Sequence, residues 1–148
     1  MTARTLLVVH GVIGFLAVFA VTHHAAYAVL SALGRRNQRA LRRFGWIAPA
    51  ALVAQIMLGL ALYPTYRVQV RAADFDQNAP FFSQLFDLKE HLAALSLAPV
   101  ILAGLAGRVS EEPAREARWS IAALSCTGTL FVWVAAIVGL CVTARHPV

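Results

Sequence analysis

The chain has 148 residues and a net charge of +6 at neutral pH, with 59% hydrophobic and only 14% charged residues. Soluble domains usually contain about 25% charged and about 45–50% apolar residues, so this composition is typical of a membrane protein and argues against an ordinary soluble enzyme. Excess arginine does not predict nucleic-acid binding here, because the arginines lie between apolar segments without interleaved aromatic residues.

Four long apolar segments follow one another, at about 5–33, 46–63, 85–107 and 119–143. Each is near or above the roughly 20 residues that a helix needs to cross a bilayer. We therefore predict one all-α domain, an integral membrane four-helix bundle. The first segment continues more than ten residues beyond a candidate signal-peptide cleavage point after Ala20, so we expect it to be a retained helix.

The connections between these segments predict the orientation of the bundle. The first, GRRNQRALRRFG at 34–45, has five arginines and no acidic residue, and the third, at 107–118, has three arginines and three glutamates. With four spans, these two connections lie on the same side, which the positive-inside rule assigns to the cytoplasm. We thus expect a multi-pass protein of the prokaryotic inner (plasma) membrane, with both termini and the connection at 64–90 on the periplasmic side.

The connection at 64–90 is rich in aromatic residues, which are typical of the membrane–water interface. Within it, Asn78 shortly before Pro80 is typical of a helix start, so the third helix is predicted to begin above the bilayer. On the last span, Cys126 and Cys141 are about 22 Å apart by helical rise and cannot form a disulfide. We interpret both as small residues of the core.

Four of the five histidines lie within or at the ends of predicted spans, where ionisable side chains are costly and tend to carry function. The chain enters the first and third helices from the same side, so His10 and His91 are predicted to face one another in the outer half. Two imidazoles so placed can ligate one haem iron. Their predicted depths differ by about 12 Å, a gap that closes only if the first helix projects beyond the membrane into the cytoplasm.

Other residues of the outer half complete the predicted haem site. Gly14, one turn after His10, leaves room for a flat macrocycle. Asp87, one turn before His91, is either a carboxylate that orients the imidazole or a solvated residue. Candidate partners for the haem propionates are the cations on the same side, Arg67, Arg71 and Lys89.

A second haem is not expected. His24 follows His10 by 14 residues on nearly the same helical face, a spacing found in helices that hold two haems. However, an inner haem lacks a second ligand, since His23 is adjacent on the same helix and Met57 is a weak candidate. The sequence therefore predicts a single haem b.

The pattern of His10 with Gly11 and Gly14, His24, and His91 within FDLKEH resembles small four-helix b-type membrane cytochromes. The resemblance covers the first and third helices, less than half of the chain. It departs from the cytochrome b561 type, which has paired histidines on more helices. The resemblance implies electron transfer between a quinone and a periplasmic or partner redox centre, as a subunit of a larger complex.

Our leading hypothesis is a membrane b-type haem protein for electron transfer, at most an oxidoreductase subunit, such as the membrane anchor of a redox complex. Expected partners are the lipid bilayer, a protein partner or second copy, and a quinone. One alternative is a non-catalytic membrane subunit or assembly factor without haem, in which polar residues only hydrogen-bond between helices. A second alternative is a small transporter with Gln55 and the histidines along a polar path.

Overall fold

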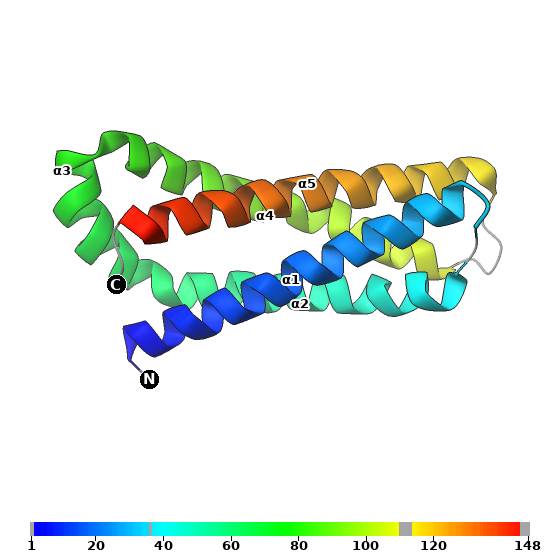
Figure 1. The fold of residues 1–148 in the computed structure, drawn as a ribbon, viewed down its shortest axis with the longest axis horizontal. Coiled ribbons are helices and arrows are strands. Elements are labelled where there is room, and N and C mark those ends of the chain that lie inside the picture. The colour runs from blue at the N-terminus through cyan, green and yellow to red at the C-terminus, as the bar shows by residue number, and fades with distance from the viewer. Residues whose placement is uncertain (1, 36, 110–113, 146–148) are drawn as a thin grey trace.

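A computed structural model describes residues 2–35, 37–109 and 114–145. Four long antiparallel helices form a bundle (Figure 1): α1 (Ala3–Ala32), α2 (Gln38–Tyr66), α4 (Pro80–Val109) and α5 (Arg115–Arg145). Each belongs to a helical stretch that is long and apolar enough to cross a membrane. The all-α membrane-type bundle predicted from the sequence is confirmed, and the described ranges contain no strand.

The order of the helices around the bundle places α1 and α4 on a diagonal. α1 packs mainly against α2 and α5, and α4 packs mainly against the same two helices, whereas α1 and α4 barely touch. A group held by both α1 and α4 would therefore have to lie across the centre of the bundle.

The connection predicted at 64–90 is helical over almost its whole length. α2 continues through Pro64 into a π-helical segment, η1 (Arg67–Phe75), and then into one short turn, α3 (Asp76–Asn78). A proline removes one backbone donor from a helix, and a π-type segment is one way in which a helix adjusts locally. Ala79 has extended backbone angles, and α4 begins at Pro80, as the sequence predicted.

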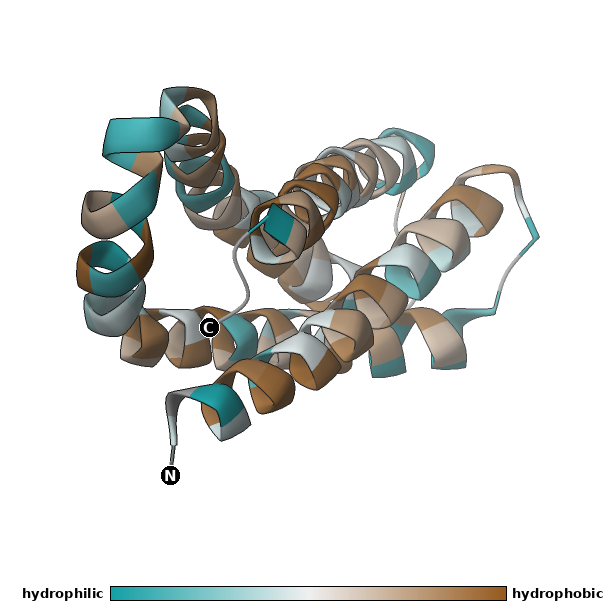
Figure 2. Cartoon of the chain, turned by 60° about the vertical axis from the view of Figure 1, so that its left-hand side comes forward, coloured by the Kyte–Doolittle hydropathy of each residue, from teal (hydrophilic) through white to brown (hydrophobic). Residues whose placement is uncertain are grey.

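α2 also begins eight residues before the predicted position 46, at Gln38, so most of the arginine-rich connection belongs to its first turns. The side chain of Asn37 caps this start by accepting a hydrogen bond from the backbone N–H of Ala40. We call this end of the bundle the arginine-rich end, and the opposite end, where η1 and α3 lie, the capped end. Hydrophilic residues gather at both ends (Figure 2).

Three clusters of buried apolar side chains fill the bundle, one in the middle and one towards each end. The cluster at the capped end joins residues of α2, η1, α4 and α5 and contains none from α1. Accordingly, the first half of α1 is largely exposed; Phe15, for example, is 75% exposed. In a membrane this face contacts lipid, and the capped-end half of α1 contributes no residue to the three core clusters.

Cys126 and Cys141 are free thiols, as predicted, but the prediction that they are core residues is wrong. Both are exposed on the outer surface of α5. The core-facing positions of this helix are instead small or β-branched residues, among them Ser125, Gly128 and Val132. In a membrane helix the outward face is as apolar as the inward one, so an apolar setting does not by itself indicate burial.

Candidate functional site

A polar contact joins α1 to α2 in the capped-end half of the bundle. Nε2 of Gln55 lies 3.0 Å from Nε2 of His10. Two glycines make room for this pair: a Cβ atom at Gly14 would lie 2.8 Å from Gln55 Nε2, and one at Gly59 would lie 3.3 Å from His10 Cε1. The space that the sequence analysis assigned to a macrocycle beside Gly14 is therefore occupied by the amide of Gln55.

This pair leaves two polar atoms without partners. Because the amide nitrogen of Gln55 can only donate, His10 Nε2 accepts, and the hydrogen of the neutral imidazole is on Nδ1. His10 Nδ1 and Gln55 Oε1 are both buried and have no hydrogen-bond partner within the described ranges. A buried polar atom left unpaired costs about 1–3 kcal/mol, so one donor and one acceptor at the same site are a reason to expect a ligand.

Lys89 of α4 brings a positive charge to the same site. Its side chain packs along α5, where a Cβ atom at Gly139 would lie 3.7 Å from Lys89 Cδ, and its Nζ lies 5.2 Å from the ring centre of Phe86. Lys89 thus lies in the same half of the bundle as the Gln55–His10 pair, on the helix diagonal to α1. We call His10, Gln55 and Lys89, the polar side chains of this half from α1, α2 and α4, the polar cluster.

His91 does not belong to this cluster. Residues two apart on a helix differ by about 200°, so His91 lies on the opposite side of α4 from Lys89. It is exposed, and its Nδ1 lies 2.7 Å from the carbonyl oxygen of Asp87. His10 and His91 therefore lie on diagonally placed helices and do not point at one another in this arrangement.

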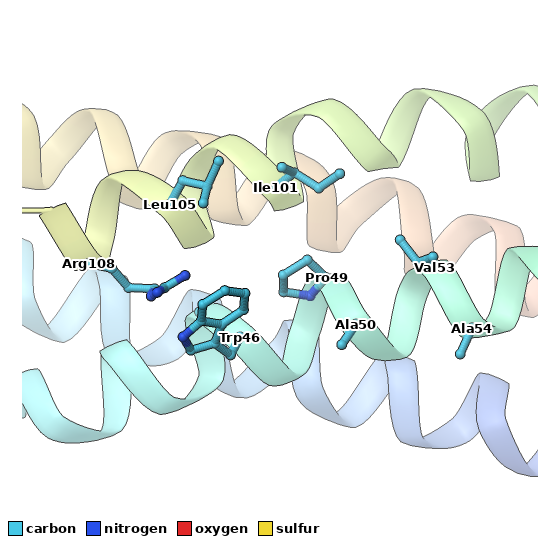
Figure 3. Close-up of a pocket in the computed structure, with 9 residues that line it drawn as sticks. Trp46, Pro49, Ala50, Val53, Ala54, Ile101, Leu105 and Arg108 are labelled. Carbon is cyan, nitrogen blue, oxygen red and sulfur yellow. The ribbon is translucent and has the colours of Figure 1, made fainter.

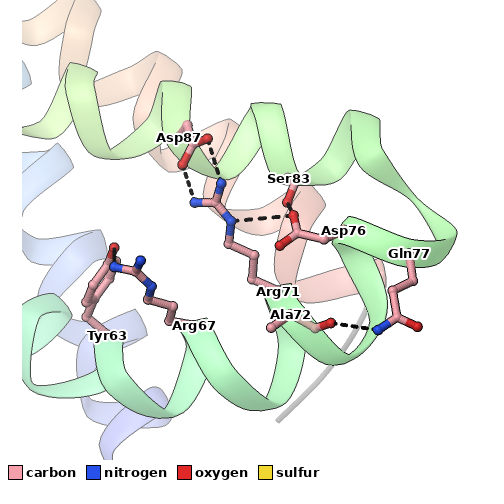
Figure 4. A network of polar contacts seen from close by, with 8 residues as sticks. All are labelled: Tyr63, Arg67, Arg71, Ala72, Asp76, Gln77, Ser83 and Asp87. Carbon is pink, nitrogen blue, oxygen red and sulfur yellow. Dashed lines mark hydrogen bonds and ion pairs between the residues drawn. The ribbon is translucent and has the colours of Figure 1, made fainter.

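Polar residues at the capped end form a network that fastens η1 to α4 (Figure 4). The Arg71 guanidinium donates to both carboxylate oxygens of Asp87, at 2.5 and 3.0 Å, and its Nε lies 3.6 Å from Asp76. Ser83 also donates a hydrogen bond to Asp76. Asp87 contacts His91 through its backbone, while its carboxylate is paired with Arg71.

Of the three cations predicted to hold propionates, Arg67 contacts only a neighbouring tyrosine on its own helical stretch within the described ranges. Its guanidinium lies over the ring of Tyr63, 5.8 Å from the centroid, and donates to the Tyr63 hydroxyl at 3.2 Å. Arg71 is occupied by two carboxylates, and Lys89 points into the bundle. The cations are thus separated, and they do not line one common pocket.

His24 lies far from the polar cluster along α1. It is only 2% exposed, and its Nδ1 lies 3.1 Å from Oγ of Ser125 on α5. Next to it, Nδ1 of His23 donates to the carbonyl oxygen of Phe19, and the His23 ring stacks on Phe44. Both side chains have structural partners at positions where the sequence analysis considered a second haem.

Gln55 was predicted to make an interhelical hydrogen bond or, in the transporter alternative, to line a polar path, and it was not assigned to the predicted cofactor site. That bond exists, but its partner is His10, and the remaining amide oxygen is unpaired. Among the described residues there is no group of three or more histidine, cysteine, aspartate or glutamate side chains that could hold a metal ion.

Comparison with protein-family models, with curated proteins and with solved structures finds none that matches this chain.

Proposed function

We propose that this protein is a membrane subunit for electron transfer and that its polar cluster binds the head group of a quinone. The observation that carries the proposal is the buried, unpaired donor–acceptor pair of His10 Nδ1 and Gln55 Oε1, with Lys89 in the same half of the bundle. Ionisable groups inside a membrane bundle are costly and tend to be kept for function.

The chemistry of a quinone matches these groups. A quinone carbonyl accepts hydrogen bonds, which His10 Nδ1 and the Lys89 ammonium supply, and a quinol hydroxyl donates one, which Gln55 Oε1 accepts. Oxidation of the quinol releases two protons and two electrons. Because His10 Nδ1 already carries its hydrogen and Nε2 accepts from Gln55, both protons leave to the aqueous phase at the capped end. The two electrons pass to a redox centre of a partner protein, because the polar cluster itself has no group that can store them.

Access to the cluster follows from the packing of α1. The capped-end half of this helix belongs to none of the three core clusters, and its residues Val8, Val12 and Phe15 are more than half exposed. A planar head group can therefore enter from the bilayer by displacing the first turns of α1, without breaking a packed core.

The distribution of arginines supports a position for this site on the outer side of the membrane. Exposed arginines of α2 and α5 lie at the arginine-rich end, which the positive-inside rule assigns to the cytoplasm. The polar cluster, the start of α1 and the end of α5 then face the periplasmic side of a prokaryotic inner membrane.

A test of the proposal is to purify the protein in mild detergent and to quantify quinone in a solvent extract. We expect close to one quinone per chain in the wild type and little in His10→Leu, because the leucine removes the Nδ1 donor. Thr127→Val, at an exposed position of α5, is the control and should retain the quinone. Absence of quinone from wild-type protein of a quinone-producing host would contradict the proposal and favour a non-catalytic membrane subunit.

Haem binding is a second candidate, favoured by the orientation of His91. Its Nδ1 is hydrogen-bonded to a backbone carbonyl, an arrangement that fixes the ring and leaves Nε2 available for iron. A haem held by both His10 and His91 does not fit the present arrangement, since Lys89 occupies the inward face of α4 and Gln55 occupies His10 Nε2. Ligation by both would require α4 to turn by about half a rotation.

The oxidised and reduced visible spectra of the same preparation distinguish the two candidates. A b-type α-band at about one haem per chain, lost in both His10→Ala and His91→Ala, would support the haem candidate over the quinone site. A colourless protein from cells supplied with haem would exclude it.

A further inference from the structure

A groove runs between α2 and α4, from Arg108 near the arginine-rich end to Ala54, the residue before Gln55 (Figure 3). Its volume is about 470 Å³. The walls are almost entirely apolar, and on the α2 side they are formed mostly by small residues. The lining includes Gly45, Trp46, Pro49, Ala50, Ile101 and Leu105, with Arg108 as its charged residue.

The close approach of two glycines produces this shape. A Cβ atom at Gly104 would lie only 2.5 Å from the carbonyl oxygen of Gly45, so the backbones of α2 and α4 touch here. The larger side chains on either side stand away from the contact, and the groove opens towards the outside of the bundle. Trp46, Val53 and Leu105 are 59%, 43% and 48% exposed, so this opening faces the acyl chains of the bilayer.

The charge at one end of the groove identifies the kind of molecule that fits. The Arg108 guanidinium lies over the indole of Trp46, 3.4 Å from the ring centre (Figure 3). No carboxylate in the described part of the chain is paired with it, and further arginines, Arg39 and Arg43, are exposed at the same end. Stacking holds the planar guanidinium in place and leaves its N–H groups free to donate to an anion.

We propose that this groove binds one anionic phospholipid, with an acyl chain against Pro49, Ala50 and Ile101 and its phosphate on Arg108. An arginine presents several N–H donors in a geometry that matches a phosphate, and the positive end of the bundle favours a lipid with net negative charge over a zwitterionic one. Basic pockets between membrane helices on the cytoplasmic side are a recurrent setting for such head groups.

The proposal is tested by native mass spectrometry of the full chain in detergent, with phosphatidylglycerol and phosphatidylcholine of identical acyl chains added in turn. We expect one phosphatidylglycerol to remain bound through activation and phosphatidylcholine to be lost. Arg108→Gln should reduce the retained fraction about tenfold, which corresponds to about 1.4 kcal/mol. Ala50→Leu, at an exposed position inside the groove, should also reduce it by filling the space of the chain.

The matched control is Arg115→Gln, which removes one exposed arginine at the same end but outside the groove. It should retain the lipid as the wild type does. Equal retention of the two lipids by the wild type, or equal losses in Arg108→Gln and Arg115→Gln, would overturn the proposal by showing only unspecific surface charge. Because the groove and the polar cluster share no residue, either outcome leaves the quinone test unaffected.

Discussion

The angular positions of two residues on α4 decide what faces the interior of the bundle. Lys89 packs against α5 beside Gly139 and reaches the polar cluster, while His91, about 200° further around the helix, is exposed. The long aliphatic stem of a lysine can lie along an apolar surface while its ammonium reaches a polar group, which makes this inward position acceptable. The interior therefore holds a lysine and a glutamine beside His10.

The bidentate ion pair between Arg71 and Asp87 joins η1 to α4, and we predict that it stabilises the capped end. Each side chain is partly exposed, so the coupling free energy in a double-mutant cycle should be modest, about 0.5–1 kcal/mol. The cycle of Arg71→Ala, Asp87→Ala and the double variant can be measured by thermal unfolding in detergent at low salt. Strictly additive losses would show that the pair contributes no coupling.

The sequence was sufficient to predict which half of the bundle holds the polar residues. It was not sufficient to predict which of these side chains face one another. The order of the spans predicted His10 and Lys89 in the same half of the bundle, and both residues lie towards the capped end of their helices. Which face of α4 points inward was not predictable, because all faces of a membrane helix are apolar and amphipathic periodicity is lost. For the same reason the pairing of Gln55 with His10, and of His24 with Ser125, required the packed structure.

Polar contacts at three successive positions along the helices hold α1 against α5. Ser125 contacts His24, Thr129 donates to the carbonyl of Val21, and the Trp133 indole donates to Thr22. This seam lies in the half of α1 nearer to the arginine-rich end, whereas the other half is exposed and reaches the polar cluster. One helix thus combines a fixed half with a loosely packed half, which suits a site that a ligand enters from the membrane.

Contact between α2 and α4 depends on glycine, and we predict that Gly104→Ala destabilises the fold by about 1–3 kcal/mol. The added Cβ would meet the backbone of Gly45 at 2.5 Å, and overpacking of this size outweighs the roughly 1 kcal/mol that alanine gains over glycine in helix propensity. Thermal unfolding in detergent measures the difference.

Gly11→Ala is the matched control for this substitution. No heavy atom lies within 4 Å of a Cβ at that position, so only the gain in helix propensity should remain. If Gly104→Ala were as stable as Gly11→Ala, the two helices would not be in backbone contact.

The boundaries of the helices show where sequence patterns fall short. The four spans, and the start of α4 at Pro80, agree with the predictions because long apolar segments and a helix-start signal are strong local features. The helical continuation through η1 and α3 was not predicted, because its residues are polar and aromatic and do not form an apolar span. Their helical conformation depends on packing, as the burial of Val70 and Phe75 indicates.

The bundle has two polar ends, one capped by η1 and α3 and the other rich in arginine. We predict that the capped end lies on the periplasmic side of the membrane. In a variant with Cys126 and Cys141 replaced by alanine, a cysteine introduced at Gln77 should react with a membrane-impermeant maleimide in intact cells. A cysteine introduced at Ala114, at the opposite end, should react only after permeabilisation. The reverse pattern of labelling would place the polar cluster on the cytoplasmic side.

The most direct test of the quinone site is calorimetric titration of the purified, quinone-free protein with a short-chain quinone. Gln55→Met and Lys89→Met keep the length of each side chain but remove its hydrogen-bonding group, and Gly11→Ala again serves as control. We predict saturable binding by the wild type and the control, and a Kd raised about tenfold in each of the two methionine variants, a loss of about 1.4 kcal/mol. A wild type that does not bind, or a Gln55→Met variant that binds as tightly as the wild type, would contradict the assignment of the polar cluster as a quinone site.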